Sequence, residues 1–319
     1  VLQHTSSLEN VMYTSPGKRP DEIAFVMKKQ IGLINIESLT EAYRIEEIAE
    51  RPQRVLLRIN TNREIHGAVT QMSSATHPSP FGISEEHISS TLKKIQELQR
   101  VNVKGFHIFS ASGVLDAQAL LNHIDYACAL TRDLEEKVGR KFPILDFGGG
   151  IVIDYEAERT FYTATFSTGL QSLIDKHEMK DKRLIFELGR YLVADAGYFC
   201  TTINDIKESR GTKILICTAG INAHRRPQAL KVNYSITILP LGKNYKYPDR
   251  LSCMNEQVQI RGPLCTEVDV LSPQASINHA ELGDLVVMHK SGAYGLTMSS
   301  QDFLSHPHVP EFVIGGAHE

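Results

Sequence analysis

The chain has 319 residues, and its 34 Lys and Arg against 37 Asp and Glu leave a formal net charge of -3. This length is enough for two domains, and the balanced charge argues against nucleic acid or an anionic membrane as the main partner. No apolar run approaches the roughly 20 residues of a membrane-spanning helix. The five scattered cysteines show neither zinc nor disulfide spacing, which indicates a reducing, cytoplasmic setting and no bound metal.

The first 200 residues alternate apolar runs with amphipathic runs. Strands are predicted at 10–14, 33–37, 54–59, 103–109, 143–147 and 183–187. Helices are predicted at 20–30, 85–98, 116–138 and 161–177. A further helix is predicted to begin after Ser38, which forms a capping box with Glu41. A polar loop is predicted at 60–80. Continuously apolar strands separated by helices are typical of a parallel sheet that is covered on both faces.

After residue 199 the pattern changes to short β-like runs between Gly, Pro and Asn turns, at 213–218, 234–239, 257–261 and 285–288. This pattern predicts an all-β domain without a strong helix. Polar and glycine-rich residues follow the strands of the first half, as at the carboxyl ends of barrel strands, and no GxGxxG follows the first strand. We therefore expect an incomplete (β/α)8 barrel at 1–199 and a β-domain at 200–319. Six strands instead of eight leave either an open sheet or a chain that enters the barrel two units late.

Three consecutive glycines, Gly148-Gly149-Gly150, end the apolar run at 142–147. Such a run is costly in backbone entropy. It is expected where the chain turns sharply and bare N–H groups approach a ligand, because a nest of N–H groups binds phosphate. The sequence therefore predicts a phosphate site here, with a simple tight turn as the alternative.

Five segments stand in order along the chain, at 105–112, 146–150, 187–191, 262–269 and 291–295. Together they resemble the fold-type III pyridoxal-phosphate-dependent decarboxylases, the diaminopimelate, ornithine and arginine decarboxylase family, over nearly the whole chain. Segments 262–266, 291–295 and 303–307 look most like a subgroup with butirosin-type glutamyl-carrier-protein and exosortase-associated decarboxylases. The resemblance implies an alanine-racemase-like TIM-type barrel, pyridoxal 5'-phosphate as cofactor and a homodimer.

The resemblance also implies roles for single residues. Glu187 would face the pyridine nitrogen, and Cys265 would protonate the substrate carbon, reaching into the site of the partner subunit. Arg226 and Asp269 would contact the substrate, although Arg226 could equally lie in a solvated basic turn. The cofactor-binding residues would be Phe109, Ser112, Gly148, Gly149, Gly150, Glu187, Gly189, Arg190 and Tyr294. His107 is as compatible with a packed core as with a function.

Several positions depart from the family pattern. Phe109 stands where the family often has a ring-stacking His, and Ala111, Val152, Thr218 and Thr266 also differ. These differences weaken the expectation of a free diamino-acid substrate.

The Schiff-base lysine of the family lies in a Tyr-Ala-x-Lys strand that has no match here, whereas Lys18 matches a later family motif. We therefore expect this chain to start inside the third β/α unit, to be part of a longer protein, and to be inactive by itself.

The leading interpretation is decarboxylation of a diaminopimelate-, ornithine- or lysine-like amino acid, or of a carrier-bound aminoacyl substrate. One alternative is a non-catalytic regulatory homologue that pairs with an active decarboxylase subunit. A racemase or another barrel enzyme with the same cofactor, and an unrelated phosphate-binding barrel, are further alternatives.

Overall fold

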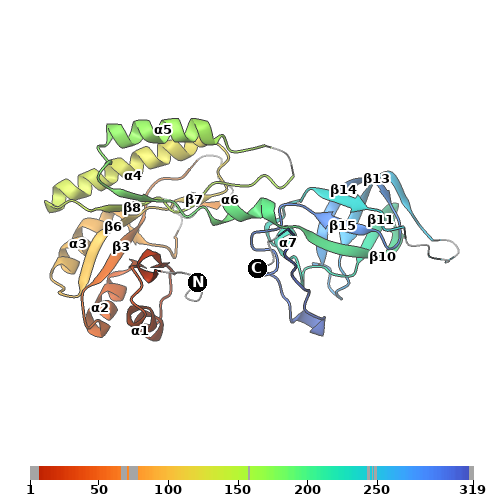
Figure 1. Ribbon diagram of the computed structural model, residues 1–319, viewed down its shortest axis with the longest axis horizontal. Helices are drawn as coiled ribbons and strands as arrows, with labels where there is room; N and C mark the ends of the chain where they lie inside the picture. Colours follow the sequence, from red (N-terminus) through yellow and green to blue (C-terminus); the bar gives the residue numbers. More distant parts are fainter. Residues whose placement is uncertain are drawn as a thin grey trace. The chain divides into compact units, whose positions relative to one another are not determined.

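The computed structural model describes residues 7–65, 70–71, 78–156, 159–242, 245, 247 and 250–315 (Figure 1). The chain divides into two compact units. Unit 1 comprises Val1–Val152 and Thr160–Leu188, and unit 2 comprises Ile153–Arg159 and Gly189–Glu319. Across the described ranges, no helix is long and apolar enough to cross a membrane.

Unit 1 is built on a parallel sheet whose strand order follows the sequence. Its path runs through β1 (Met12–Tyr13), β2 (Leu33–Ile36), β3 (Gln53–Asn60), β6 (Val101–His107), β8 (Ile144–Asp146) and β9 (Arg183–Ile185), and the short β5 (Ile83–Ser84) pairs with β3. All of these pairings are parallel. The six predicted strands thus form an open half-barrel of β/α units, which confirms the predicted fold class.

Helices follow the strands and form one continuous layer. They are α1 (Pro20–Lys28), α2 (Leu39–Ile48), α3 (Ile88–Gln96), α4 (Ala117–Val138) and α5 (Thr163–Lys176). Each contacts the next in chain order (Figure 1). Helix α4 begins where the Asp116 side chain accepts a hydrogen bond from the Gln118 N–H (2.8 Å), and it ends at Gly139 in the left-handed conformation (φ 63°). These caps fix where the chain leaves β6 and enters β8.

The shorter elements of the chain join these strands and helices. They are η1 (Leu8–Asn10), β4 (Thr70–Gln71), η2 (Glu85–His87), β7 (Ala111–Ser112), η3 (Ala194–Ala196) and η4 (Phe303–Ser305). Strands β4 and β7 pair with each other in a small antiparallel sheet. Of the polar loop predicted at 60–80, residues 66–69 and 72–77 lie outside the described residues.

The inner strands of unit 1 are mostly buried, which explains why the sequence shows little polar alternation there, whereas the end strands β1 and β9 are partly exposed. All four residues of β2 are buried, and Leu33, Leu56 and Ile144 form one apolar cluster across the sheet. Asn35 in β2 and Arg58 in β3 are buried polar exceptions within these runs. Buried polar groups need partners, and both residues belong to the site described below.

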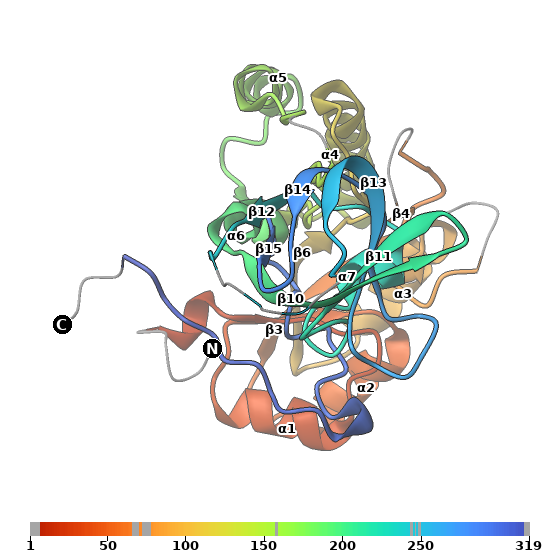
Figure 2. The ribbon, with the colours of Figure 1, turned by 90° about the vertical axis from the view of Figure 1, so that its right-hand side faces the viewer.

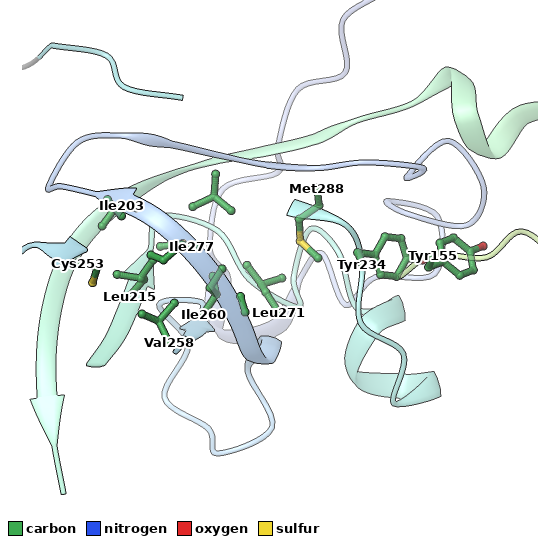
Figure 3. Close-up of a cluster of buried hydrophobic side chains, with 14 of the residues drawn as sticks. Tyr155, Ile203, Leu215, Tyr234, Cys253, Val258, Ile260, Leu271, Ile277 and Met288 are labelled. Atoms are coloured by element: carbon green, nitrogen blue, oxygen red, sulfur yellow. The ribbon is translucent and has the colours of Figure 1, made fainter. Parts of the chain in front are cut away.

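Unit 2 is a six-stranded sheet that nearly closes on itself. Its strand order is β12 (Ile236–Leu239), β15 (Leu285–Met288), β10 (Phe199–Ser209), β11 (Thr212–Cys217), β13 (Cys253–Arg261) and β14 (Val270–Ala280). The end strands β12 and β14 also contact each other (Figure 2). The interior is filled by aliphatic side chains such as Leu215, Ile260 and Ile277, with the Tyr155–Tyr234 pair at one end (Figure 3).

Some expectations need correction. The sequence pattern misses β10 and β14, because the pairings of both strands contain register shifts that interrupt the two-residue alternation. Two short helices, α6 (Gly189–Val193) and α7 (Arg226–Leu230), accompany the strands of unit 2. Only one of the two hydrogen bonds of the predicted α2 capping box is present. The Ser38 hydroxyl accepts from the Glu41 N–H (3.2 Å), whereas the Glu41 carboxylate accepts from the Glu37 N–H (2.8 Å).

Candidate active site

Three titratable side chains meet at the carboxyl ends of neighbouring strands in unit 1. His107 ends β6, Asp146 ends β8, and Glu187 follows β9 by two residues. One ligand atom from each lies within 4.8 Å of the other two. Parallel strands place their carboxyl ends at one edge, which is where barrel enzymes carry their chemistry. We call these three residues the carboxylate cluster.

His107 is held as a neutral hydrogen-bond donor. Asn35 Nδ2 lies 3.1 Å from His107 Nδ1. Since an amide NH2 group can only donate, Nδ1 accepts and the ring proton lies on Nε2. Burial, reinforced by the charges of Arg58 and Lys18, lowers the pKa of His107 to about 3. Nε2 is buried without a hydrogen-bond partner among the described residues, 4.0 Å from Glu187 Oε2.

Asp146 and Glu187 are two carboxyl groups in a space that disfavours two charges. Asp146 Oδ1 accepts a hydrogen bond from the Gly148 N–H (2.8 Å), and its Oδ2 is buried without a partner among the described residues. Burial and the neighbouring Glu187 raise the pKa of Asp146 to about 8. Burial also raises the pKa of Glu187, although hydrogen bonding from Asp146 opposes this rise. The two groups therefore titrate as a pair.

The glycine run forms a cradle beside this cluster. Gly148 and Gly150 have φ values of 66° and 121°, which favour glycine. A Cβ on Gly149 would lie 2.7 Å from the Glu187 carbonyl oxygen, and one on Gly148 would lie 2.6 Å from the Phe109 side chain. The Gly148 N–H is already bonded to Asp146. Within the described ranges, the run therefore offers two free N–H groups, from Gly149 and Gly150, instead of the three expected.

The loop after β6 completes this side of the site. The Phe109 ring lies parallel to the His107 ring, with 6.3 Å between centroids and 11° between planes. The N–H groups of Gly113 and Val114 donate to the Gly150 carbonyl (3.0 and 2.8 Å), which ties the residues after Ser112 to the glycine run. The structure thus brings together the unit 1 residues that the sequence predicted, namely Phe109, Ser112, Gly148, Gly149, Gly150 and Glu187.

Two buried ion pairs lie next to the cluster, and sequence reasoning missed both as site components. Arg58 Nη1 bonds Glu37 Oε1 at 3.0 Å, and Lys18 Nζ lies 3.1 Å from Glu41 Oε2. All four residues are buried, which explains how they lower the pKa of His107 without solvent screening. Charged residues inside or directly after apolar strands are the sequence signal that could have found Arg58 and Glu37, whereas Lys18 and Glu41 carry no such signal.

Unit 2 holds a group of cationic and aromatic side chains, the arginine cluster of Arg190, Arg226 and Tyr294. The guanidinium carbons of Arg190 and Arg226 lie 5.6 and 5.2 Å from the centroid of the Tyr294 ring. Arg226 is only 3% exposed, yet its Nε and Nη2 have no partner among the described residues. The alternative of a solvated basic turn is therefore wrong for Arg226, and two buried donors are available to an anion. Gly189 begins α6 beside Arg190, with open space around its Cα.

Cys265 and Asp269 lie in one turn of unit 2 but in different surroundings. Cys265 is exposed. Asp269 is buried, and its two carboxylate oxygens accept from the N–H groups of Ile221 (2.8 Å) and Leu264 (2.7 Å). These bonds join two backbone segments, and the expected contact of Asp269 with a substrate stays a prediction.

The donor sets suit a ring-shaped ligand that carries a phosphate. The ligand atoms of the carboxylate cluster lie within 4.8 Å of one another, so these three side chains could also hold a metal ion. The free N–H groups of the glycine cradle suit a phosphate, and the carboxylate cluster suits a protonated ring nitrogen. The residues present therefore fit pyridoxal phosphate.

Comparison with known families agrees with this chemistry. Residues 1–194 match the family model "Pyridoxal-dependent decarboxylase, pyridoxal binding domain". The chain therefore belongs to the pyridoxal-phosphate-dependent decarboxylases, as the five sequence segments predicted.

Particular relatives lie in unusual branches of this family. The chain is 31% identical over 310 residues to 2-((L-alanin-3-ylcarbamoyl)methyl)-2-hydroxybutanedioate decarboxylase of Staphylococcus aureus, covering 95% of this chain and 76% of that protein. It is 29% identical over 313 residues to L-glutamyl-(BtrI acyl-carrier protein) decarboxylase of Niallia circulans, covering 94% and 71%.

Solved structures establish the same fold. Diaminopimelate decarboxylase of Helicobacter pylori, complexed with L-lysine, superposes with a TM-score of 0.81 at 24% identity, over 94% of this chain and 72% of that chain. The arginine decarboxylase of Paramecium bursaria Chlorella virus gives 0.76 at 18% identity, over 95% and 76%.

Proposed function

We propose that this protein decarboxylates an α-amino acid whose distal end is anionic or joined to a carrier. The observation behind this proposal is which buried charged groups of unit 2 have hydrogen-bond partners and which have none. Arg226 is buried with two donors that lack a partner among the described residues, while Asp269 has both oxygens engaged by backbone N–H groups. A buried guanidinium with donors to spare, in a unit whose buried Asp269 carboxylate is already engaged, suits a substrate carboxylate better than a second ammonium group.

The relatives support this choice of substrate class. The Staphylococcus aureus and Niallia circulans enzymes are named for an amide-extended hydroxy acid and a carrier-bound glutamyl group. Diaminopimelate decarboxylases match at lower identity, for example 27% over 312 residues for the enzyme of Zymomonas mobilis. Thr266, which replaces an acidic residue of the family pattern after Cys265, removes one more partner for a distal amine.

Each cluster has a proposed task in binding the cofactor. In unit 1, the N–H groups of Gly149 and Gly150, with Ser112, would hold the phosphate. In unit 2, Gly189, Arg190 and Tyr294 are the further residues proposed to bind the cofactor. Glu187 would hold a negative charge opposite the pyridine nitrogen, with Phe109 against the ring. When bound, pyridoxal phosphate supplies an electron-accepting ring that stabilises the charge left by departing CO2.

Two further residues would act on the substrate. Arg226 would bind its distal carboxylate, because the buried guanidinium has donors to spare. Cys265 would deliver the proton that replaces CO2, since its thiol is exposed and can reach a group brought to the turn. A second copy of the chain would complete the site in a homodimer, as the family resemblance implies. Static light scattering of the purified protein tests the dimer directly.

The lysine that carries the cofactor aldehyde is proposed to be absent from these 319 residues. Lys18, in the segment that matches a family motif, is fully buried, and its ammonium is bonded to Glu41 and to the Ser15 carbonyl. Borohydride reduction of the cofactor-loaded protein followed by peptide mapping tests this point. A pyridoxyl-lysine inside the present sequence would contradict it.

The activity test compares two substrate classes on the same protein. CO2 release is measured from lysine, ornithine and diaminopimelate, and in parallel from glutamyl thioesters and amide-extended 2,3-diaminopropionates. We expect turnover of the glutamyl thioesters and amide-extended 2,3-diaminopropionates in preference to the diamino acids. We expect Arg226→Met to lose this preference. Preference for the diamino acids would overturn the substrate proposal. These 319 residues by themselves are expected to release no CO2, because the aldehyde-carrying lysine is proposed to be absent from them, so the comparison is made on a protein that also supplies this lysine. In that protein, cofactor binding without CO2 release from any member would favour the non-catalytic homologue.

A further inference from the structure

Two buried side chains, His107 and Asp146, lie close to the carboxylate of Glu187 and come from different strands. His107 Nε2 lies 4.0 Å from Glu187 Oε2 and has no other partner among the described residues. The only atom of Asp146 left without a partner in the described part of the chain is Oδ2. Both groups belong to the cluster whose ligand atoms lie within 4.8 Å of one another.

We propose that Asp146 and His107 are positioning residues, which each present a proton to Glu187 and so keep its carboxylate ionised as the single negative charge of the cluster. Asp146 would supply its Oδ2–H, and His107 its Nε2–H. Asn35 determines which ring nitrogen of His107 carries the proton. Its amide donates to Nδ1, so the proton lies on Nε2. The inference rests on the proposed function in one respect, namely that this charge faces a pyridinium.

The electrostatic surroundings support one proton and one charge in the Asp146–Glu187 pair. Burial raises the pKa values of both carboxyl groups, that of Asp146 to about 8. Burial alone therefore favours the protonated form of Glu187. Hydrogen bonding from Asp146 acts in the opposite direction and lowers the pKa of Glu187.

The other charges around the cluster are already neutralised. Arg58 on β3 faces the cluster and is paired with Glu37. Lys18, before α1, acts on His107 and is paired with Glu41. Arg58 and Lys18 thus keep His107 neutral, and the charge of Arg58 also lowers the pKa values of Glu187 and Asp146 while it is paired with Glu37. The proton on Asp146 is what allows two carboxyl groups to share this space.

This arrangement matches the net charge of the cluster to its ligand. A single carboxylate opposite a protonated ring nitrogen leaves the buried site neutral, whereas two carboxylates would leave an uncompensated charge. Asn35, His107 and Asp146 would therefore set the protonation of the ring without touching the reacting carbon.

The test measures carboxyl titration in the apo-protein by 13C NMR with labelled Asp and Glu side chains. Asp146→Asn and Glu187→Gln assign the two signals and preserve side-chain shape. We expect Asp146 to titrate near pH 8 and Glu187 below neutrality, and we expect the step near pH 8 to vanish in Asp146→Asn. A midpoint of Asp146 near 4 would overturn the inference.

Variants of His107 and Asn35 test the role of the His107 Nε2 proton. His107→Leu and Asn35→Leu should each raise the Glu187 midpoint by about one pH unit, as expected for the loss of a donor to a charged group. His107→Gln, which keeps an N–H at the same reach, should leave the midpoint within a few tenths of a unit. An unchanged midpoint in folded Asn35→Leu, or an equal rise in His107→Gln, would contradict the role of the Nε2 proton.

A parallel measurement separates this inference from the proposed function. Pyridoxal phosphate binding to the wild-type protein is followed by fluorescence. The predicted titrations together with no binding would overturn the proposed function and leave the proton assignment standing. Normal binding with two ionised carboxyl groups at pH 7 would overturn the inference alone.

Discussion

The two units build their charged sites by different means. In unit 1, the carboxylate cluster is assembled at the ends of hydrogen-bonded parallel strands, and its cations Arg58 and Lys18 already have carboxylate partners. In unit 2, Arg226 is buried on a five-residue helix with two donors unpaired among the described residues, beside the exposed Tyr294 in a left-handed conformation (φ 60°). A polar network that is satisfied internally holds its geometry before a ligand arrives, whereas an unpaired buried guanidinium is costly until an anion arrives.

The largest expected effect concerns the turn that carries Cys265. Asp269→Ala leaves the buried N–H groups of Ile221 and Leu264 without an acceptor. We expect a loss of about 2–5 kcal/mol in the free energy of unfolding, measured by urea titration. The exposed neighbour Glu267, with its side chain 93% accessible, is the control, and Glu267→Ala should cost less than about 1 kcal/mol. Equal effects of the two changes would refute the structural role of Asp269.

The second prediction addresses the cradle of unit 1. Gly149→Ala places a Cβ 2.7 Å from the Glu187 carbonyl oxygen, so the glycine run or the segment after β9 must move. We expect a cost of about 1–3 kcal/mol in stability and a fall of about ten- to a hundredfold in pyridoxal phosphate affinity. Gly17→Ala is the matched control, because a Cβ added at Gly17 would meet no described atom within 4 Å. A cofactor affinity that Gly149→Ala leaves intact would contradict the proposed cradle.

The third prediction uses pH to separate the units. Asp146 has a pKa of about 8 in the folded protein against 3.8 for an ordinary aspartate. The folded state keeps a proton that the unfolded chain releases, so this contribution to stability is complete below pH 3.8 and is lost as the pH rises to 8. Relative to Asp146→Asn, the wild type should lose up to about 1.4 kcal/mol per pH unit over that window, measured by denaturant titration.

Two controls belong to the pH prediction. The pKa of His107 is lowered from 6.5 to about 3, so its contribution is complete above 6.5 and is lost as the pH falls. This slope has the opposite sign and is present in both proteins, so it cancels in the difference. Asp175→Asn, at an exposed carboxylate whose pKa is lowered by the hydrogen bond from Lys180, should give a difference of the opposite sign. A flat difference for Asp146→Asn would show that Asp146 is ionised in the folded state.

The smallest effect is expected in the arginine cluster and has an unusual sign. Arg226→Met removes a buried charge that has two donors without a partner in the described part of the chain, and it keeps most of the side-chain volume. We expect a gain of about 1 kcal/mol in stability, with a rise of about tenfold or more in KM for an anionic substrate. The exposed neighbour provides the control Arg225→Met, which should change neither quantity. A loss of stability in Arg226→Met would indicate that the cation–π contacts outweigh the unpaired donors.

The contrast between the units also explains what the sequence could predict. In unit 1, buried parallel strands leave continuous apolar runs, so the predicted strands overlap the observed ones, and the residues that follow them fall at one edge. In unit 2, β10 and β14 each span eleven residues and escaped prediction, because their register shifts break the alternation.

Roles that depend on contacts between distant segments could not be predicted. Asn35 and His107 are 72 residues apart, and nothing local marks them as partners. Asp269 belongs to a family motif, yet its role follows from its bonds to Ile221 and Leu264, and one of these residues lies 48 positions away. Local patterns indicated which residues gather, whereas the protonation and pairing of those residues required the three-dimensional structure.

The central claim is that the glycine cradle and Glu187 of this chain bind pyridoxal phosphate. Equilibrium dialysis of the purified protein against pyridoxal phosphate, with Gly149→Ala and Glu187→Gln alongside, tests it most directly. The account predicts one saturable site per chain, weakened in both variants and displaced by excess inorganic phosphate. Binding that is absent in the wild type, or that persists unchanged in both variants, would contradict it.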